Sequence, residues 1–324
     1  MTQKIIAFTG YKTAEYLERP LGELRAGHCQ VRTEYTLVSG GTERFNIMKE
    51  DSKEYPTYLG YCGVGRIEAV GEGVPHFAVG DRVLIYHGHH TNRQIIRYQD
   101  LTKVEDDDLS SLEAVFVVIA AMGLGGMRRL KVEVGESAMV VGMGLLGLFA
   151  LNFCRMAGAY PVIAVDPDPK RRELALKMGA DRAIDPSELA GMDRRIDACV
   201  EVPGYASALK QLLPAMKRFG RVSLLGCTRV SDELIDYYFQ VHKPGIQLLG
   251  AHNMARPALD SRPGCWTHQD DCKAILRLMS GGRISAKPML GRVVDPEDCA
   301  EIYRQLCEDA DFPVGTVFDW RDKA

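Results

Sequence analysis

The sequence lacks any Cys-x-x-Cys pair, although its 324 residues contain nine cysteines, an odd number scattered along the chain. A structural zinc site gathers four cysteine or histidine ligands from closely spaced pairs, and a disulfide framework favours an even number of cysteines. We therefore predict neither a structural zinc site nor a disulfide network. Reduced thiols are typical of cytoplasmic proteins, and this is the location that we expect.

The sequence also lacks an excess of positive charge and a long apolar run. Its formal net charge is −3, which argues against a nucleic-acid partner or an anionic membrane surface. No apolar stretch approaches the roughly 20 residues that span a membrane. Residues 1–10 carry one lysine and a short apolar run interrupted by Thr9, so they read as a first strand and not as a signal peptide. We expect a small-molecule substrate and neither a membrane nor a nucleic acid as partner.

The first third of the chain consists of short strand-like runs that glycines interrupt. Frequent turns between short strands favour a compact β-barrel-type domain. The predicted strands are Lys4–Phe8, Cys29–Val38, Val64–Val70 and Arg82–Tyr86.

A long apolar segment marks the change to a second pattern. Ser110, Ser111 and Glu113 form a helix-start signal before Ala114–Leu124, which is almost wholly apolar. We predict a buried helix that links two domains, and its 11 residues or so are too few to span a membrane.

From Ser137 onward, strands and helices alternate, as in a doubly wound parallel sheet. The predicted helices between the strands are Leu145–Ala157, Lys170–Lys177, Tyr205–Met216 and Glu233–Gln240. The predicted strands are Ser137–Val141, Tyr160–Val165, Arg182–Ile184, Asp197–Glu201, Arg221–Leu225 and Ile246–Gly250. Two helices, Gln269–Ser280 and Pro296–Glu308, and a strand, Gly315–Trp320, close the chain.

The strongest motif is the glycine fingerprint Gly142-Met-Gly144-Leu-Leu-Gly147, which lies between an apolar strand and an apolar helix. Gly142 permits a tight turn, Gly144 lets a pyrophosphate approach the backbone, and Gly147 lets the helix pack against the strand. The phosphates would meet free N–H groups at the start of the helix, including those of Leu145 and Leu146. The motif predicts a dinucleotide site.

An acidic residue at the end of the next strand selects the nucleotide. Asp166 follows Gly147 by 19 residues, and a carboxylate there accepts hydrogen bonds from the ribose hydroxyls of NAD and repels the 2′-phosphate of NADP. Arg171 and Arg172, within about one helical turn, weaken this preference, and we include Arg171 among the cofactor-binding candidates. We predict NAD as the cofactor.

With the barrel-like first domain, the ordered landmarks resemble the medium-chain dehydrogenase/reductase superfamily. They are Phe8-Thr-Gly, Gly41-Thr-Glu, Gly60-Tyr-Cys-Gly-Val-Gly, Val79-Gly-Asp-Arg-Val and the fingerprint. The resemblance implies an α/β chain with a GroES-like catalytic domain at residues 1–117 and 258–324 and a Rossmann coenzyme domain at 118–257. It also implies a homodimer or homotetramer, because relatives pair their sheets where Ile246–Gly250 lies.

The zinc ligands of that superfamily are missing from the matching positions. Gly40 stands where the first cysteine is expected, Tyr61 and Cys62 replace the histidine and glutamate of Gly-His-Glu, and the third ligand position falls near Val118. Catalytic zinc needs three protein donors, so we predict that no metal is bound. The chain resembles the zinc-lacking, sorbitol or alcohol dehydrogenase-like branch, which includes the bacteriochlorophyllide hydroxyethyl dehydrogenases.

Without zinc, a side chain must bind the substrate oxygen and exchange its proton. Tyr61 is the first candidate, since a phenol donates to a carbonyl or, with a lowered pKa, accepts from an alcohol; the alternative is a packed aromatic ring. Thr42 matches the threonine that passes a proton towards solvent in the superfamily, although it is also suited to capping a turn. Phe45 replaces the next member of that relay.

Three histidines follow a predicted strand, in the segment Tyr86-His-Gly-His-His. His87 and His89 would share one face if the strand continued, and His89 and His90 are candidate catalytic residues. A proton relay, a new metal site and a solvated loop remain open as interpretations.

The remaining candidates concern the substrate. Glu43 beside Arg44 either binds a polar substrate or forms an exposed ion pair. His252 and Asn253 follow the last coenzyme-domain strand and are candidate substrate-binding residues. Cys62 is either a reactive thiol or, as is usual for buried cysteines, inert.

These observations predict an NAD-dependent oxidoreductase that interconverts a secondary alcohol and a ketone without zinc. A double-bond reductase of the quinone or enoyl type is the alternative within enzymes, although such reductases usually prefer NADPH. A nucleotide-binding module without catalysis is the third possibility.

Overall fold

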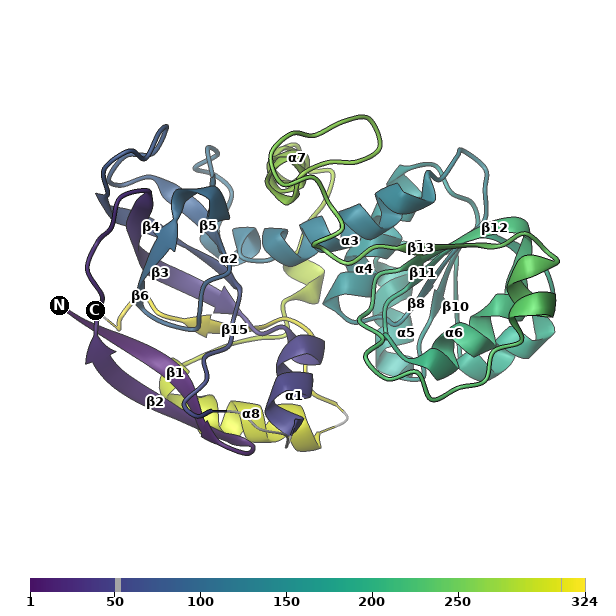
Figure 1. Ribbon diagram of the computed structural model, residues 1–324, viewed down its shortest axis with the longest axis horizontal. Helices are drawn as coiled ribbons and strands as arrows, with labels where there is room; N and C mark the ends of the chain where they lie inside the picture. Colours follow the sequence, from purple (N-terminus) through teal and green to yellow (C-terminus); the bar gives the residue numbers. More distant parts are fainter. Residues whose placement is uncertain (50–53, 310, 324) are drawn as a thin grey trace. The chain divides into compact units, whose positions relative to one another are not determined.

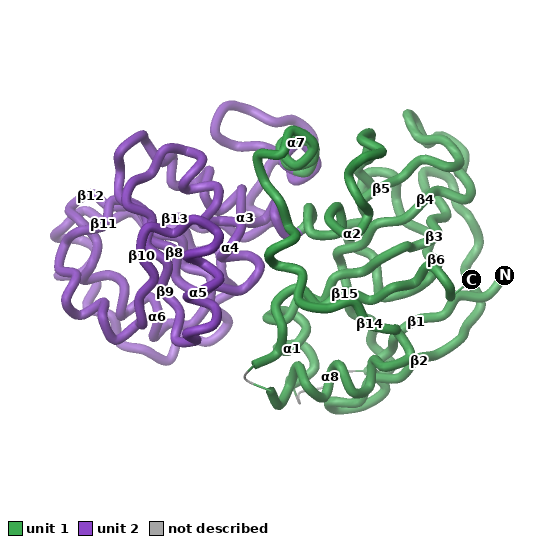
Figure 2. Tube along the Cα trace, turned by 180° about the vertical axis from the view of Figure 1, so that it is seen from behind, with its two compact units in different colours: residues 1–118, 272–324 green, residues 119–271 purple. Residues whose placement is uncertain are grey.

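The computed structural model describes residues 1–49, 54–309 and 311–323, which form two compact units. The first unit contains residues 1–118 and 272–324, and the second contains residues 119–271 (Figure 2). The second boundary lies at 272 and not at the predicted 258. Arg256 explains this difference, because it pairs with Asp271 and donates to the carbonyl of Ala121, which ties its loop to the second unit.

The first unit is built on a two-stranded and a seven-stranded sheet. Strands β1 and β2 form an antiparallel hairpin, and the larger sheet has the order β14-β15-β3-β4-β5-β7, with β6 also paired to β3. The C-terminal strand β15 pairs with β3, so the end of the chain completes the N-terminal domain (Figure 1). The strands are β1 Thr2–Gly10, β2 Thr13–Pro20, β3 His28–Leu37, β4 Cys62–Val70, β5 Arg82–Tyr86, β6 Arg93–Arg97, β7 Leu101–Lys103, β14 Arg292–Val294 and β15 Thr316–Asp319.

Two helices cover the hairpin side of this unit. Helix α1 (Gly40–Met48) packs on α8 (Cys299–Glu308), and α8 packs on β2. The aromatic side chains of Phe8, Tyr303, Phe318 and Trp320 fill the core between them. The sequence pattern predicts α8 but not α1, β2 or β6, because charged and polar residues in these three elements obscure the alternation of apolar positions.

The second unit is a parallel sheet flanked by helices, as predicted. Its strand order is β10-β9-β8-β11-β12-β13, so the chain reverses direction across the sheet between β8 and β11. Ligands of such sheets bind at this switch point, at the carboxyl ends of the strands. The strands are β8 Ala138–Val141, β9 Val162–Val165, β10 Arg182–Ile184, β11 Ile196–Glu201, β12 Met216–Leu224 and β13 Gln247–Gly250, and the helices between them are α4 Leu145–Met156, α5 Pro169–Lys177 and α6 Ala206–Leu212.

Two helices predicted in this unit differ from the structure. The helix predicted at Tyr205–Met216 ends at Leu212, because a tighter turn that contains Pro214 follows at Leu213–Ala215 and Met216 already belongs to β12. The predicted helix Glu233–Gln240 is wrong: the structure has only a π-helical turn at Tyr238–His242.

The apolar linking segment is longer than predicted. Helices α2 (Ser111–Ala114) and α3 (Val117–Leu130) form a nearly continuous run, and α7 (His268–Ser280) carries the chain back into the first unit. Residues 111–130 are long and apolar enough to cross a membrane by length and composition alone, and 61% of the most apolar window is buried inside the protein. Core helices pass the same test.

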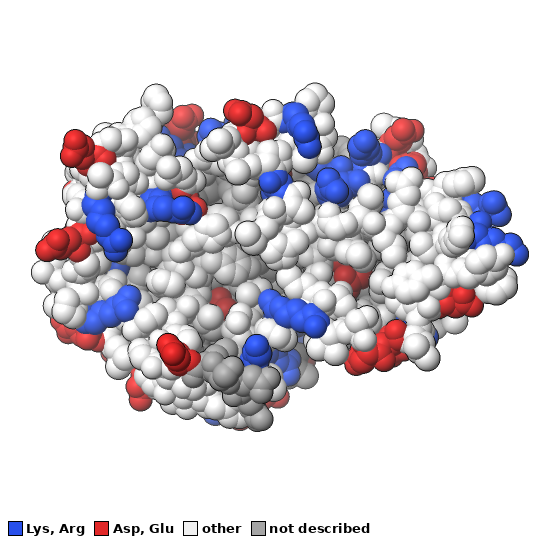
Figure 3. Space-filling view, in the orientation of Figure 1, with Lys and Arg blue, Asp and Glu red and all other residues white. Residues whose placement is uncertain are grey.

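Charged side chains of both signs lie interspersed on the face seen in Figure 3.

Candidate functional site

The glycine fingerprint forms the turn between β8 and α4. Gly142 has a φ of 89°, a conformation that favours glycine, and a Cβ atom at position 147 would overlap the carbonyl oxygen of Gly142. A Cβ atom at Gly144 would instead meet nothing within 4 Å, so this backbone faces open space. The turn therefore has the shape that a pyrophosphate requires, with the first N–H groups of α4, at Leu145 and Leu146, left over by the helix geometry.

Asp166 ties the second strand to this turn. It is only 3% exposed, and its carboxylate accepts hydrogen bonds from the N–H groups of Met143 at 2.7 Å and Asp168 at 2.9 Å. Each oxygen retains a further lone pair for a ribose hydroxyl. Arg171 lies 3.5 Å from Asp168, and Arg172 donates to the carbonyls of Asp166 and Pro167, so both arginines have partners beside the acid.

Glu201, which the sequence analysis did not single out, borders the same turn. It ends β11, pairs in register with Val141 and is fully buried. One carboxyl oxygen accepts from the N–H of Gly204 at 2.6 Å, and the other has no partner among the described residues. Burial raises the pKa of Glu201 to about 7, against the hydrogen bonds from Gly204 and Tyr205. A carboxyl group at the end of an apolar strand was the signal that could have found it.

In the first unit, the structure brings Tyr61 and Thr42 together with Ser39. The Tyr61 hydroxyl lies 2.6 Å from that of Ser39, and it also bonds to the Thr42 side chain. Burial, reinforced by Cys62, raises the pKa of Tyr61 well above 10 despite these two bonds. Tyr61 is therefore a protonated donor, and the lowered pKa considered for it is wrong. Ser39 was missed; its place directly before Gly-Gly-Thr was the available signal.

Glu43 lies behind this group in a buried hydrogen-bond network. It is 1% exposed, and its carboxylate accepts from the Tyr303 hydroxyl at 2.7 Å, from the backbone N–H of Ser39 at 2.8 Å and from Nε2 of His90 at 3.2 Å. Burial raises the pKa of Glu43, but His90 and the other donors outweigh it and hold that pKa below its usual value. The prediction of an exposed ion pair between Glu43 and Arg44 is therefore wrong, since Arg44 instead donates to the carbonyl of Cys307.

The orientation of His90 follows from its second neighbour, Thr36. The indole N–H of Trp320 donates to the Thr36 hydroxyl at 2.9 Å, which leaves that hydroxyl free to donate to Nδ1 of His90 at 2.7 Å. Nε2 of His90 then carries the proton that points at Glu43. A Cβ atom at Gly60 would lie 2.8 Å from the His90 ring, so the backbone before Tyr61 rests directly on this network.

The other histidines do not converge, because β5 ends at Tyr86. His87 is exposed, has a φ of 57° and bonds to Asp100 at 3.0 Å. His89 is half-buried beside Tyr58, and burial, with His90 and Arg19, lowers its pKa to about 4. The shared face predicted for His87 and His89 is therefore wrong, and a neutral His89 is unsuited to donating a proton near pH 7.

The two substrate candidates lie after β13. His252 is exposed, and its Nδ1 accepts from the N–H of Met254, while Asn253 is half-buried in the same turn. Their proposed contact with substrate remains a prediction.

Comparison with known proteins identifies the family of the chain. Residues 25–138 match the alcohol dehydrogenase GroES-like domain, and residues 146–260 match the zinc-binding dehydrogenase family. The chain is 31% identical over 236 residues to the L-threonine 3-dehydrogenase of Anaeromyxobacter dehalogenans, an alignment that covers 61% of this chain and 67% of that protein. The chain belongs to the medium-chain dehydrogenase/reductase superfamily.

A further relative and a solved structure are also similar to the chain. The sorbitol dehydrogenase of Bacillus subtilis is 29% identical over 210 residues, an alignment that spans 53% of this chain and 60% of the relative's length. A Sinorhizobium meliloti 1021 protein assigned as a zinc-binding dehydrogenase and bound to NADP has the same fold, with a TM-score of 0.83, 18% identity and coverage of 98% and 99% of the two chains.

The zinc ion that the name of the matched zinc-binding dehydrogenase family implies does not fit the residues at hand. Gly40 and Val118 offer no side-chain donor, and the Tyr61 phenol is already bonded. Burial, with Glu43 and Cys272, raises the pKa of Cys62 well above its usual value, which disfavours the thiolate that binds zinc. In residues 1–49, 54–309 and 311–323, no three His, Cys, Asp or Glu side chains cluster to hold a metal.

Proposed function

We propose that this medium-chain dehydrogenase interconverts a secondary alcohol and a ketone with NAD(H) and without zinc. The observation that carries the proposal is the hydroxyl cluster of Tyr61, Ser39 and Thr42 where the superfamily holds a zinc ligand. The similarity to sorbitol and threonine dehydrogenases supports a polyol or another small hydroxylated substrate.

A nicotinamide bound at the fingerprint turn would supply the hydride chemistry, and the protein's own side chains must manage the proton on the substrate oxygen. In the direction of reduction, the Tyr61 phenol donates a hydrogen bond to the carbonyl oxygen and then its proton to the developing alkoxide. The hydroxyl of Ser39 or Thr42, bonded to Tyr61, then passes a proton from solvent water to Tyr61 and is itself left unchanged. Because burial raises the pKa of Tyr61, the donor stays protonated through neutral pH, which favours ketone reduction over alcohol oxidation there.

The Glu43 network positions Tyr61 from behind. Ser39 connects the two, since its backbone N–H donates to the Glu43 carboxylate while its hydroxyl contacts Tyr61. The buried carboxylate thus fixes the start of α1 and, with it, the hydroxyl beside Tyr61. Glu43 and His90 are positioning residues in this proposal.

The preference for NAD over NADP rests on Asp166. A buried carboxylate with one oxygen bonded to the fingerprint turn disfavours an added phosphate on the ribose, although the S. meliloti protein of the same fold binds NADP. Fluorescence titration should give tighter binding of NADH than of NADPH, and Asp166→Ala should reduce the difference. Asp181→Asn is the control, because Asp181 accepts from Val162 at the opposite end of β9.

The catalytic proposal is tested by Tyr61→Phe, which keeps the ring and removes the proton. We expect ketone reduction to fall about a hundredfold or more with NADH binding unchanged. Tyr58→Phe is the matched control, since Tyr58 stacks on Arg19 and contacts His89. Full turnover by Tyr61→Phe would contradict the proposal. So would one zinc per chain in protein purified without chelators, or a protein that reduces only enoyl or quinone substrates.

We also propose that the chain is a cytoplasmic homodimer or homotetramer. Strand β13 is at the edge of its sheet, where a second copy would extend the pairing, and the described cysteines form no disulfide. Light scattering after size exclusion checks the oligomeric state.

A further inference from the structure

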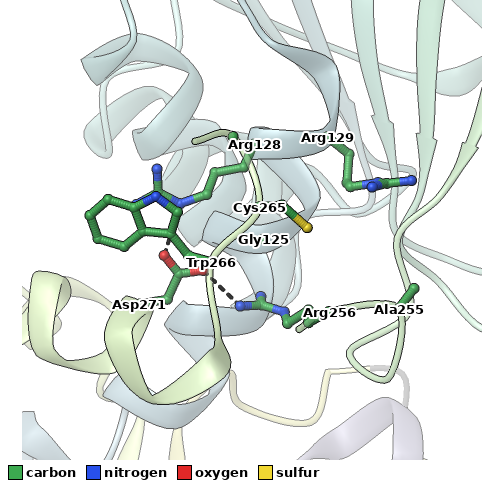
Figure 4. A pocket seen from close by; sticks show the side chains of 9 residues that line it. Gly125, Arg128, Arg129, Ala255, Arg256, Cys265, Trp266 and Asp271 are labelled. Carbon is green, nitrogen blue, oxygen red and sulfur yellow. Dashed lines mark hydrogen bonds and ion pairs between the residues drawn. The ribbon is translucent and has the colours of Figure 1, made fainter. Parts of the chain in front are cut away.

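Three arginines and a tryptophan line a recess in the second unit, between α3 and the loop that follows β13. Arg128 and Arg129 come from α3, and Arg256 and Trp266 come from the loop (Figure 4). No residue of the fingerprint turn lines this recess. A Cβ atom at Gly125 would overlap the Arg256 guanidinium, so glycine at this position of the helix is what admits the arginine.

One buried carboxylate orders two of the arginines. Asp271 is fully buried and accepts from Nε of Arg128 at 2.8 Å and from a terminal nitrogen of Arg256 at 2.7 Å. The Arg128 guanidinium also lies 4.1 Å from the centre of the Trp266 ring, which holds it flat. These contacts fix both side chains before any ligand arrives.

Arg129 is the third cation, and no residue that the structure describes neutralises it. It has no hydrogen bond or ion pair with any described residue, and its Nε is buried without a partner. The recess is therefore lined by three guanidinium groups and one carboxylate, which leaves two positive charges in excess. Leaving a buried donor unpaired is costly, so a purely structural cluster would not need Arg129.

We propose that this recess binds a phosphoryl group, separately from the dinucleotide site. The excess of two positive charges matches a phosphate dianion, and planar guanidinium forks are suited to its oxygens. Arg129 would supply the main new contact, while Arg128 and Arg256 contribute the terminal N–H groups that Asp271 does not use. The proposal does not depend on the substrate or on the cofactor preference argued above.

Titration of the purified full chain with inorganic phosphate tests the site. We expect one phosphate per chain by calorimetry and a change in Trp266 fluorescence, because Arg128 lies on that ring. Arg129→Gln should weaken binding about tenfold or more with unchanged thermal stability, since Arg129 stabilises no described contact. Arg129→Lys should bind phosphate with an affinity between those of wild type and Arg129→Gln, because lysine keeps the charge and loses the planar guanidinium. Arg218→Gln is the control, since Arg218 is exposed on β12.

Two competition experiments identify the source of the phosphoryl group. If glycerol 3-phosphate binds and glycerol does not, the ligand is a phosphorylated metabolite. If only inorganic phosphate binds, the ligand is the free anion. Both results support the site. Displacement of phosphate by saturating NADH would overturn the proposal of a separate site. The absence of saturable binding, or equal affinity in Arg129→Gln and wild type, would overturn the proposal altogether.

Discussion

The two units build their sites in different ways. In residues 119–271, the dinucleotide site uses six consecutive residues and one acid, Asp166, which lies 23 positions after the Met143 N–H that it binds. In the other unit, Glu43 meets His90 from 47 positions away and Tyr303 from 260. The first site is a local turn that any parallel sheet can carry, whereas the second exists only when the whole first unit is folded.

This difference predicts that mutations affect the two sites separately, and the two tryptophans allow it to be measured. Trp266 lies in the second unit and Trp320 in the first, so their fluorescence follows the unfolding of each unit by itself. The comparison fails if every destabilising substitution moves both signals equally.

The largest effect should come from Gly147→Ala. The new methyl group would overlap the Gly142 carbonyl, so either α4 or the turn must move. We expect a loss of more than about 3 kcal/mol in the second unit and loss of NADH binding. Gly144→Ala is the matched control, because its methyl group meets no protein atom within 4 Å. Its stability should equal that of wild type, whereas its affinity for NADH should be lower because the methyl group occupies the space of the pyrophosphate. Equal stability of the two variants would contradict this assignment.

Glu43→Ala should be the largest change in the first unit. It leaves His90, Tyr303 and the Ser39 N–H without their buried acceptor, and we expect a cost of about 3 kcal/mol on the Trp320 signal. The sign of the pH dependence follows from the pKa of Glu43, which lies below its usual 4.5. Its contribution is therefore present above pH 4.5 and lost as the pH falls below that value. Glu308→Ala, at an exposed pair with Arg304, should cost under about 1 kcal/mol.

These two substitutions also separate what the sequence could and could not predict. The fingerprint, Asp166 and the strand order were readable because glycines, apolar runs and an acid follow each other at fixed spacing. The role of Glu43 was not readable, because its partners His90 and Tyr303 come from other parts of the chain and its neighbour Arg44 suggested a surface pair. The return to the first unit at 272 was misplaced for the same reason, since only the Arg256 and Asp271 contact reveals it.

Glu201 offers a third test, this time of the pH dependence of the second unit. Its pKa is raised from 4.5 to about 7, so the native state holds this proton more tightly than the unfolded chain. The contribution of Glu201 to the free energy of unfolding is therefore fully present below pH 4.5. It falls by about 3 kcal/mol between pH 4.5 and 7 and does not change further above pH 7. Glu201→Gln should abolish that slope in urea unfolding followed at Trp266, while Glu173→Gln on the exposed face of α5 should keep it. A slope unchanged in Glu201→Gln would refute the assignment.

The smallest effect should come from His87→Ala, which tests whether the histidine segment acts as one group. His87 is exposed, and its pair with Asp100 should contribute under about 0.5 kcal/mol. His90→Ala, three residues further on, removes a fully buried ring between Thr36 and Glu43 and should destabilise the first unit by several times as much. Three histidines that look alike along the chain thus differ because β5 ends at Tyr86, and only His90 turns into the core. Comparable losses of stability or of turnover in the two variants would show that the segment works as a unit after all.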